Sequence, residues 1–139
     1  MEPGDAEAVA GLTSQLGYER NAERIRAWIS AAAAAPDEQA AFVACAGGEV
    51  VGWIEVSVEK RLQSEAFAMI GGLVVRDGER GHGIGRRLCQ TAENWAWERG
   101  FRTVRVTSRS TREDAHRFYL RDGYELVKTS LVFEKNRPD

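Results

Sequence analysis

The apolar residues of this chain recur at helical spacing in some segments and at alternate positions in others. Helical spacing predicts helices in these places: between Asp5 and Gly17, between Asn21 and Pro36, from 84 to 99, and after Ser110. Asp5 is the predicted N-cap of the first helix. Ser110 and Glu113 form a predicted capping box for the last one.

Runs of strand length fill most of the remaining chain: 41–46, 50–59, 66–75, 102–108 and, as a final strand pair, 124–134. Gly47-Gly48-Glu49 separates the first two runs and predicts a β-hairpin turn. Trp53 and Glu55 share one face of the second run, and this alternation favours antiparallel pairing. Gly71-Gly72 lies inside the third run, where glycine permits a bulge or a close backbone approach.

The segment between the third run and the helix at 84–99 is Arg80-Gly81-His82-Gly83-Ile84-Gly85-Arg86-Arg87. Alternating glycines let successive N–H groups turn toward one anion at the positive start of a helix. Arginine binds phosphate through a rigid fork of donors, so a diphosphate is the favoured ligand. The glycine spacing differs from a dinucleotide fingerprint, and Arg86-Arg87 replaces the Lys-Ser/Thr of a triphosphate loop. The alternative is a flexible basic surface turn.

Two motifs in this order give the sequence a specific resemblance. Arg80-x-x-Gly83-x-Gly85, after Leu73-Val74-Val75, resembles the acyl-CoA pyrophosphate loop of the GNAT superfamily of N-acetyltransferases. The segment Ala115-His116-Arg117-Phe118-Tyr119-Leu120-Arg121-Asp122-Gly123-Tyr124 is similar to the Ala-x-x-Phe-Tyr-x-x-x-Gly-Phe/Tyr signature of that family. The resemblance covers roughly residues 40–134. It implies a three-layer α/β fold with helices on both faces of a mixed, mostly antiparallel sheet that splays at its centre.

The resemblance also implies acetyl-CoA as the acyl donor. Main-chain groups around Leu73 to Val75 would pair with the pantetheine arm, and the glycine-rich loop would hold the diphosphate. Arg112 stands where the family often has a coenzyme-contacting asparagine. The implied coenzyme-binding residues are Leu73, Val74, Val75, Arg80, Gly81, His82, Gly83, Ile84, Gly85, Arg86 and Arg112.

Acetyl transfer to an amine needs an oxyanion donor, an acid for the CoA thiolate and a route for the ammonium proton. By resemblance, Tyr119 is the acid and a main-chain N–H near Leu73 is the oxyanion donor. The run 66–75 has no acidic residue, so Glu55 on the expected neighbouring strand is the candidate base. The alternatives are a core role for Tyr119 and a solvent-exposed Glu55.

The acceptor is expected to be a primary amine of a small molecule or peptide, and its identity stays open. In the family, the loop between the first two helices covers the acceptor side, so Tyr18, Glu19 and Arg20 are candidate substrate-binding residues. They are equally compatible with a solvated linker. A non-catalytic acyl-CoA-binding regulatory module is the alternative function. An RNA-binding role ranks last, because no exposed aromatics interleave with the arginines.

Length and composition add limits to this hypothesis. The length of 139 residues fits one domain, 1–139, and a net charge of −2 gives no general attraction to nucleic acid. No leader-like or membrane-spanning segment is evident, so a cytoplasmic protein is expected, and a homodimer stays open. Cys45 and Cys89 are predicted to be reduced core thiols. His82 and His116 lack metal-ligand spacing, so no metal is expected.

Overall fold

A computed structural model describes residues 1–14, 21–79 and 81–139 of the chain. The described residues form two compact units, Met1–Thr107 and Ser108–Asp139. The single domain expected from the chain length stays a prediction. In the described residues, no helix is long and apolar enough to cross a membrane.

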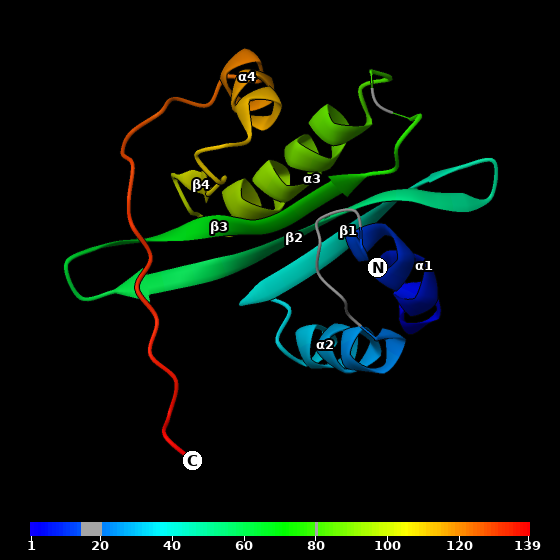
Figure 1. Cartoon of the computed structure of the whole chain (residues 1–139), viewed down its shortest axis with the longest axis horizontal. Coiled ribbons are helices and arrows are strands. Elements are labelled where there is room, and N and C mark those ends of the chain that lie inside the picture. The colour runs from blue at the N-terminus through cyan, green and yellow to red at the C-terminus, as the bar shows by residue number, and fades with distance from the viewer. Residues whose placement is uncertain (15–20, 80) are drawn as a thin grey trace. The chain divides into compact units, whose positions relative to one another are not determined.

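The first unit is built on a sheet with the strand order β1-β2-β3-β4 (Figure 1). Strands β1 (Gln39–Ala46), β2 (Glu49–Arg61) and β3 (Ser64–Val75) are antiparallel, whereas β4 (Val104–Val106) runs parallel to β3. The sheet is therefore mixed and mostly antiparallel, as the sequence predicts. Strand β4 is shorter than the predicted run 102–108.

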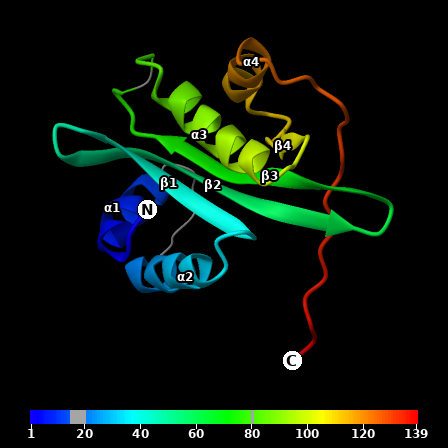
Figure 2. The ribbon, with the colours of Figure 1, turned by 180° about the vertical axis from the view of Figure 1, so that it is seen from behind.

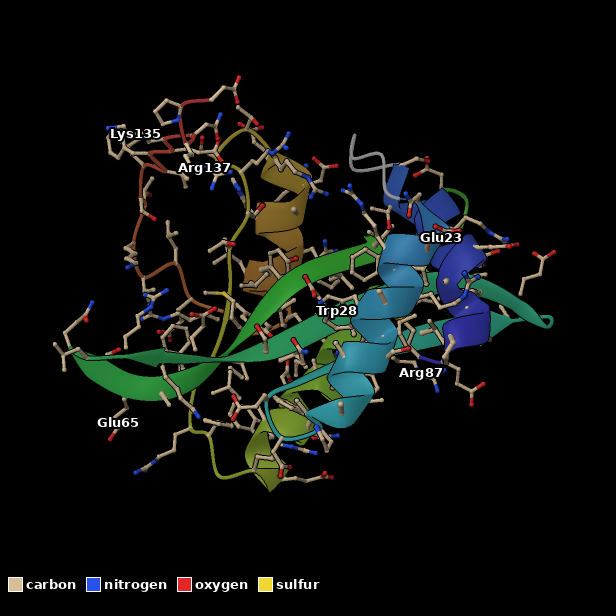
Figure 3. The ribbon with its side chains drawn as sticks, turned by 90° about the horizontal axis from the view of Figure 1, so that it is seen from below. Glu23, Trp28, Glu65, Arg87, Lys135 and Arg137 are labelled. Atoms are coloured by element: carbon tan, nitrogen blue, oxygen red, sulfur yellow. The ribbon has the colours of Figure 1, made fainter. Side chains whose placement is uncertain are left out.

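Helices cover both faces of this sheet. The short 3-10 helix η1 (Pro3–Asp5) leads into α1 (Ala6–Thr13), and α2 (Ala22–Ala34) follows. Helices α1 and α2 lie on one face, and α3 (Ile84–Glu98) lies on the other (Figures 2 and 3). The predicted three-layer α/β arrangement is thus confirmed for this unit.

Local signals place several of these elements where the sequence predicts them. The Asn21 side chain caps α2 by accepting a hydrogen bond from the Arg24 N–H at 2.8 Å. Asp5 stands at the N-cap of α1, but its carboxylate accepts from the Glu2 N–H at 2.7 Å instead. Gly47 and Gly48 have φ of 59° and 80°, as a type I′ turn requires, and they join β1 to β2.

Buried apolar residues lie on both faces of the sheet, in α1 and α2 on one side and in α3 on the other. Buried residues of α3 recur at helical spacing, as predicted: Leu88, Cys89, Ala92, Trp95 and Ala96. They lie on the face of the sheet to which Gly52 points, because a Cβ there would be 3.2 Å from a Leu88 methyl carbon. Neither cysteine forms a disulfide in the described residues, but Cys45 is exposed at the end of β1, so its predicted core position is wrong. Cys45 lies near the end of an edge strand, where few neighbouring residues shield a side chain from solvent.

The glycine pair in β3 forms a bulge opposite Glu55. Glu55 pairs with Gly72 and Val56 pairs with Ile70, so Gly71 is the extra residue. A Cβ at Gly71 would lie 2.5 Å from Glu55 Oε1, and one at Gly72 would lie 2.7 Å from Trp53 Cη2. The pair therefore gives room to the two side chains that cross it from β2.

Alanine at Gly72 is expected to lower stability by about 1–3 kcal/mol, the usual cost of overpacking, because the Trp53 ring must move. Gly11→Ala is the matched control, since Gly11 lies within α1 and a Cβ there has no heavy atom within 4 Å. That control is expected to raise stability by about 0.5–1 kcal/mol, because alanine favours helix. Urea unfolding followed by circular dichroism measures both, and equal shifts would contradict the role given to Gly72.

The second unit contains α4 (Glu113–Arg121), which begins later than predicted. Its N-cap is Arg112, and no side chain caps it, so the predicted capping box of Ser110 and Glu113 is wrong. The His116 Nε2 atom lies 2.7 Å from the Arg109 carbonyl oxygen, which ties the helix to the preceding turn.

Residues 125–139 contain neither helix nor strand, so the predicted final strand pair is also wrong. A strand requires a neighbouring strand for its main-chain groups, and this unit supplies none in its described residues. The apolar side chains of the segment are exposed: Leu126, Val127, Leu131, Val132 and Phe133.

Candidate functional site

The predicted anion loop lies between the end of β3 and the start of α3. Gly83 is the N-cap of α3 with φ 76° and ψ 9°, a left-handed conformation, and Gly81 has φ 88°. The Arg87 N–H donates to the Gly83 carbonyl at 3.1 Å and so begins the helical ladder. Amides before that bond point out of the helix start, where the helix dipole favours an anion. Arg80 lies outside the described residues.

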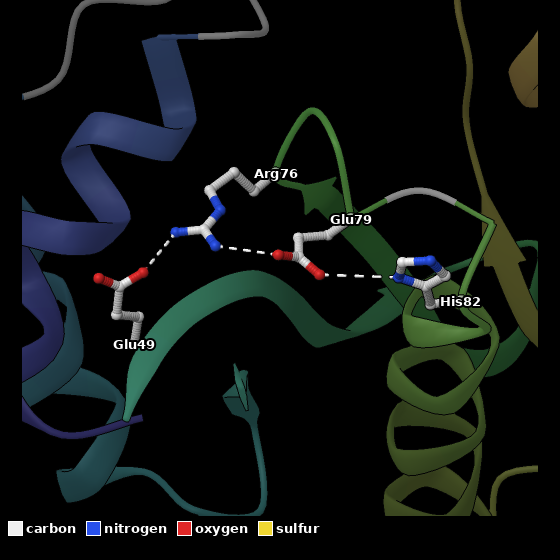
Figure 4. A network of polar contacts seen from close by, with 4 residues as sticks. All are labelled: Glu49, Arg76, Glu79 and His82. Atoms are coloured by element: carbon white, nitrogen blue, oxygen red, sulfur yellow. Dashed lines mark hydrogen bonds and ion pairs between the residues drawn. The ribbon is translucent and has the colours of Figure 1, made fainter. Parts of the chain in front are cut away.

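An ion-pair network holds the segment that leads into this helix start (Figure 4). The Arg76 guanidinium donates to Glu49 Oε2 at 2.8 Å and to Glu79 Oε1 at 3.0 Å. These hydrogen bonds, first that with Glu49 and then that with Glu79, raise the pKa of Arg76, so the group stays cationic. The other Glu79 oxygen lies 3.7 Å from His82 Nδ1.

The edge of β3 that faces β4 is paired over only a short length. The β3–β4 ladder joins Ala68 to Val104 and ends where Ile70 meets Val106. On its other edge β3 continues along β2, with Leu73 opposite Ile54 and Val75 opposite Gly52. The sheet therefore opens on the β4 side beyond Ile70, as the predicted splay requires.

Trp53 and Glu55 lie at the bulge, on the face opposite α3. Gly52 points toward α3, and side chains alternate along a strand, so Trp53 points to the face that α1 and α2 cover. Trp53 Nε1 is buried and has no hydrogen-bond partner in the described part of the chain. A buried unpaired donor is costly, which makes it a candidate for ligand contact. Glu55 is half-buried beside it.

Tyr119 and Arg112 belong to the second unit, so no distance relates them to the loop. Tyr119 is half-buried in an aromatic group, with ring centroids 5.2 Å from Phe118 and 5.7 Å from Tyr124. Arg112 is exposed at the start of α4. Tyr18, Glu19 and Arg20 lie outside the described residues. The roles of all five residues stay predictions.

Sequence reasoning missed the network around Arg76 and the unpaired Trp53 N–H. Arg76, Glu79 and Glu49 are ordinary surface charges in the sequence, and only the fold brings Glu49 to the end of β3. An acidic and a basic residue three positions apart were the one local signal. Residues 1–14, 21–79 and 81–139 contain no group of three His, Cys, Asp or Glu that could hold a metal ion.

A model of the acetyltransferase (GNAT) family matches residues 9–124. The chain belongs to the GNAT family. An aminoalkylphosphonate N-acetyltransferase of Salmonella typhimurium is 38% identical to it over 84 residues, which make up 60% of this chain and 54% of that protein. This chain thus spans about half the length of that relative.

Solved structures share the fold over nearly the whole length. The CoA complex of the aminoglycoside N-acetyltransferase AAC(6')-Iy matches with a TM-score of 0.83 and 20% identity, covering 99% of this chain and 97% of that one. A transcriptional regulator from Bacillus halodurans matches with a TM-score of 0.81 and 28% identity, covering 95% and 94%. GNAT structures therefore share the α/β arrangement described above.

Proposed function

We propose that this GNAT chain is an acetyl-CoA-dependent N-acetyltransferase that acts on a primary amine. The observation that carries the proposal is the left-handed Gly83 at the start of α3, shortly after a strand that pairs with β4 only from Ala68 to Ile70. A helix start with outward amides suits a diphosphate, and an open strand edge suits an amide-containing arm. Membership of the GNAT family supports the same proposed function.

In this proposal the loop residues hold the donor. Main-chain N–H groups of Gly81, Gly83 and Gly85 face the diphosphate, and the arginines beside them add charge. His82 is exposed at the same turn, where it can reach a phosphate oxygen. Leu73 to Val75 present main-chain groups to the pantetheine amides. Arg112 contacts the coenzyme in place of the family asparagine.

The proposed reaction moves one acetyl group from sulfur to nitrogen and involves three proton transfers. The neutral amine forms a C–N bond to the thioester carbonyl carbon, and a main-chain N–H near Leu73 stabilises the oxyanion. The C–S bond then breaks, and the Tyr119 hydroxyl gives its proton to the departing thiolate. The attacking nitrogen still carries one extra proton, and its loss gives the neutral amide and restores the Tyr119 hydroxyl. Glu55 receives the proton of the incoming ammonium, directly or through a water. Tyr18, Glu19 and Arg20 line the acceptor side.

Trp53 and Glu55 indicate which class of amine serves as the acceptor substrate. A carboxylate attracts an ammonium, and an indole face adds a cation–π contact. The buried Trp53 N–H needs an oxygen acceptor. We therefore propose a small amine that carries a hydroxyl, phosphonate or carboxylate oxygen near the nitrogen. Two relatives are named for such compounds, aminoalkylphosphonate and dTDP-fucosamine, the latter in Escherichia coli.

An acceptor panel tests the function. Aminoalkylphosphonates, amino sugars, an aminoglycoside, short peptides and plain alkylamines are each incubated with acetyl-CoA. CoA release and the mass of the acetylated product are followed together. The proposal expects transfer to oxygen-bearing amines and little to alkylamines of equal length. CoA release without any acetylated amine would contradict it.

Glu55→Gln is expected to lower kcat/KM by about tenfold or more and to remove the ascending acid-side limb of the pH–rate profile. Acetyl-CoA affinity should stay nearly unchanged, because the change lies away from the loop. Glu59→Gln, on the same strand beyond the bulge, is the matched control. A profile that keeps its acid limb in Glu55→Gln would show that water or the free amine equilibrium supplies the neutral amine.

A non-catalytic acyl-CoA-binding regulatory module is the second candidate. The observation in its favour is the fold shared with a protein named as a transcriptional regulator. Such a module would bind acetyl-CoA but transfer acetyl to no amine in the panel. Its location would be cytoplasmic, as the enzyme's would be, because acetyl-CoA is an intracellular metabolite.

A further inference from the structure

Glu79 lies in the turn before the anion loop, and each of its carboxylate oxygens faces a basic side chain. One oxygen accepts from Arg76 at 3.0 Å, and the other lies 3.7 Å from His82. The side chain of Glu79 is only 27% exposed, whereas that of Glu49 is 68% exposed. A carboxylate beside a diphosphate site would repel the ligand unless a cation held it, so its pairing matters.

Arg76 is fixed at both its main chain and its side chain. Its N–H donates to the Val51 carbonyl at 2.7 Å, which extends the β2–β3 pairing by one residue. The Glu79 N–H donates to the Arg76 carbonyl at 3.0 Å and closes the turn 76–79. The guanidinium then reaches Glu49, the first residue of β2. Arg76 therefore joins the β1–β2 hairpin to the turn.

These contacts form one continuous clasp, defined as Glu49, Arg76, Glu79 and His82 (Figure 4). It begins on the hairpin and ends next to Gly83, the left-handed N-cap of α3. Exposed ion pairs of this kind add little to global stability. Their effect is local, because they restrict the segment that must present its amides in one geometry.

We propose that Arg76 and Glu79 are positioning residues for the coenzyme diphosphate, a role that rests on the proposed function. The clasp holds residues 76–79 and His82 in the binding conformation before the ligand arrives, so that less conformational freedom is lost on binding. Arg76 does not bind the diphosphate itself, because both sides of its guanidinium already meet carboxylates. Each member acts through the loop.

Two acyl donors separate positioning from a general structural effect. Acetyl-CoA carries the diphosphate, whereas S-acetylpantetheine lacks it. In Arg76→Gln and Glu79→Gln, KM for acetyl-CoA is expected to rise about tenfold while kcat and KM for S-acetylpantetheine stay near wild type. The double variant should resemble the single ones, because the residues act as one device. Arg76→Lys should recover part of the loss.

Glu38→Gln is the matched control, since it breaks the Lys60–Glu38 ion pair of 3.2 Å elsewhere in the same unit. This variant should leave kcat and KM unchanged for both acetyl-CoA and S-acetylpantetheine. Melting temperatures check that every variant is folded. Tighter acetyl-CoA binding by Glu79→Gln would overturn the inference, because Glu79 would then only repel the ligand. An equal loss with both donors, or no loss, would also overturn it.

A direct titration with acetyl-CoA distinguishes failure of the proposed function from failure of the positioning role alone. If the wild-type chain binds no acetyl-CoA in a direct titration, the proposed function and this inference fail together. If the wild type binds acetyl-CoA and the clasp variants bind it equally well, only the positioning role fails. The titration is made on the whole chain, with acetyl-CoA as the probe.

Discussion

Gly83→Val is expected to weaken acetyl-CoA binding by about 100-fold or more. Gly83 has φ 76° at the N-cap of α3, a conformation that a β-branched residue rarely adopts. Valine would also put methyl groups where the phosphate must approach the amides. At about a hundredfold excess over Kd the ligand adds roughly 2.7 kcal/mol to stability. That gain, a melting shift of several degrees, should disappear in the variant.

Gly100→Val is the matched control for backbone strain. Gly100 follows α3 with φ 84°, and a Cβ there meets no heavy atom within 4 Å. Both variants should lose stability without ligand, but only Gly100→Val should regain the wild-type shift when acetyl-CoA is added. If acetyl-CoA shifts the melting temperatures of the two variants equally, the loop is not part of the binding site.

Tyr119→Phe is expected to lower kcat by about 10²-fold while leaving acetyl-CoA affinity unchanged. The substitution removes one hydroxyl and keeps the ring, so the edge contacts with Phe118 and Tyr124 survive. The loss follows if Tyr119 protonates the CoA thiolate, because the thiolate would otherwise leave unprotonated. Steady-state rates with the best acceptor of the panel measure it.

Tyr124→Phe is the control for loss of a hydroxyl from the same aromatic group. It should change kcat by about twofold at most, as a residue without a part in the chemistry would. Acetyl donors with more acidic thiols offer a second check, because a thiolate that needs no acid to leave should restore the rate of Tyr119→Phe. Wild-type turnover in Tyr119→Phe would assign Tyr119 to packing alone.

Short-range signals predicted much of the first unit. Gly47 and Gly48 supply the positive φ values of the hairpin turn, and Asn21 caps α2 as its side chain suggests. The helical spacing of α3 gives its buried stripe. Each of these depends on a few neighbouring residues, so the sequence carries the information directly.

Some failures depend on contacts far apart in sequence, and one concerns a local signal that the helix does not use. The run 124–134 is predicted as a strand pair interrupted near Lys128, but it finds no strand partner in its unit. Ser110 and Glu113 have capping-box spacing, yet α4 begins at Glu113. Gly71-Gly72 signalled a bulge, but the reason for it, space for Trp53 and Glu55, required the β2–β3 register.

A crystal structure of the whole chain with CoA tests the central claim most directly. This account predicts the diphosphate against the main-chain N–H groups at Gly81, Gly83 and Gly85, with the pantetheine arm along the Leu73 to Val75 edge of β3. The clasp should keep its contacts in the complex. A diphosphate bound away from the start of α3 would contradict the account.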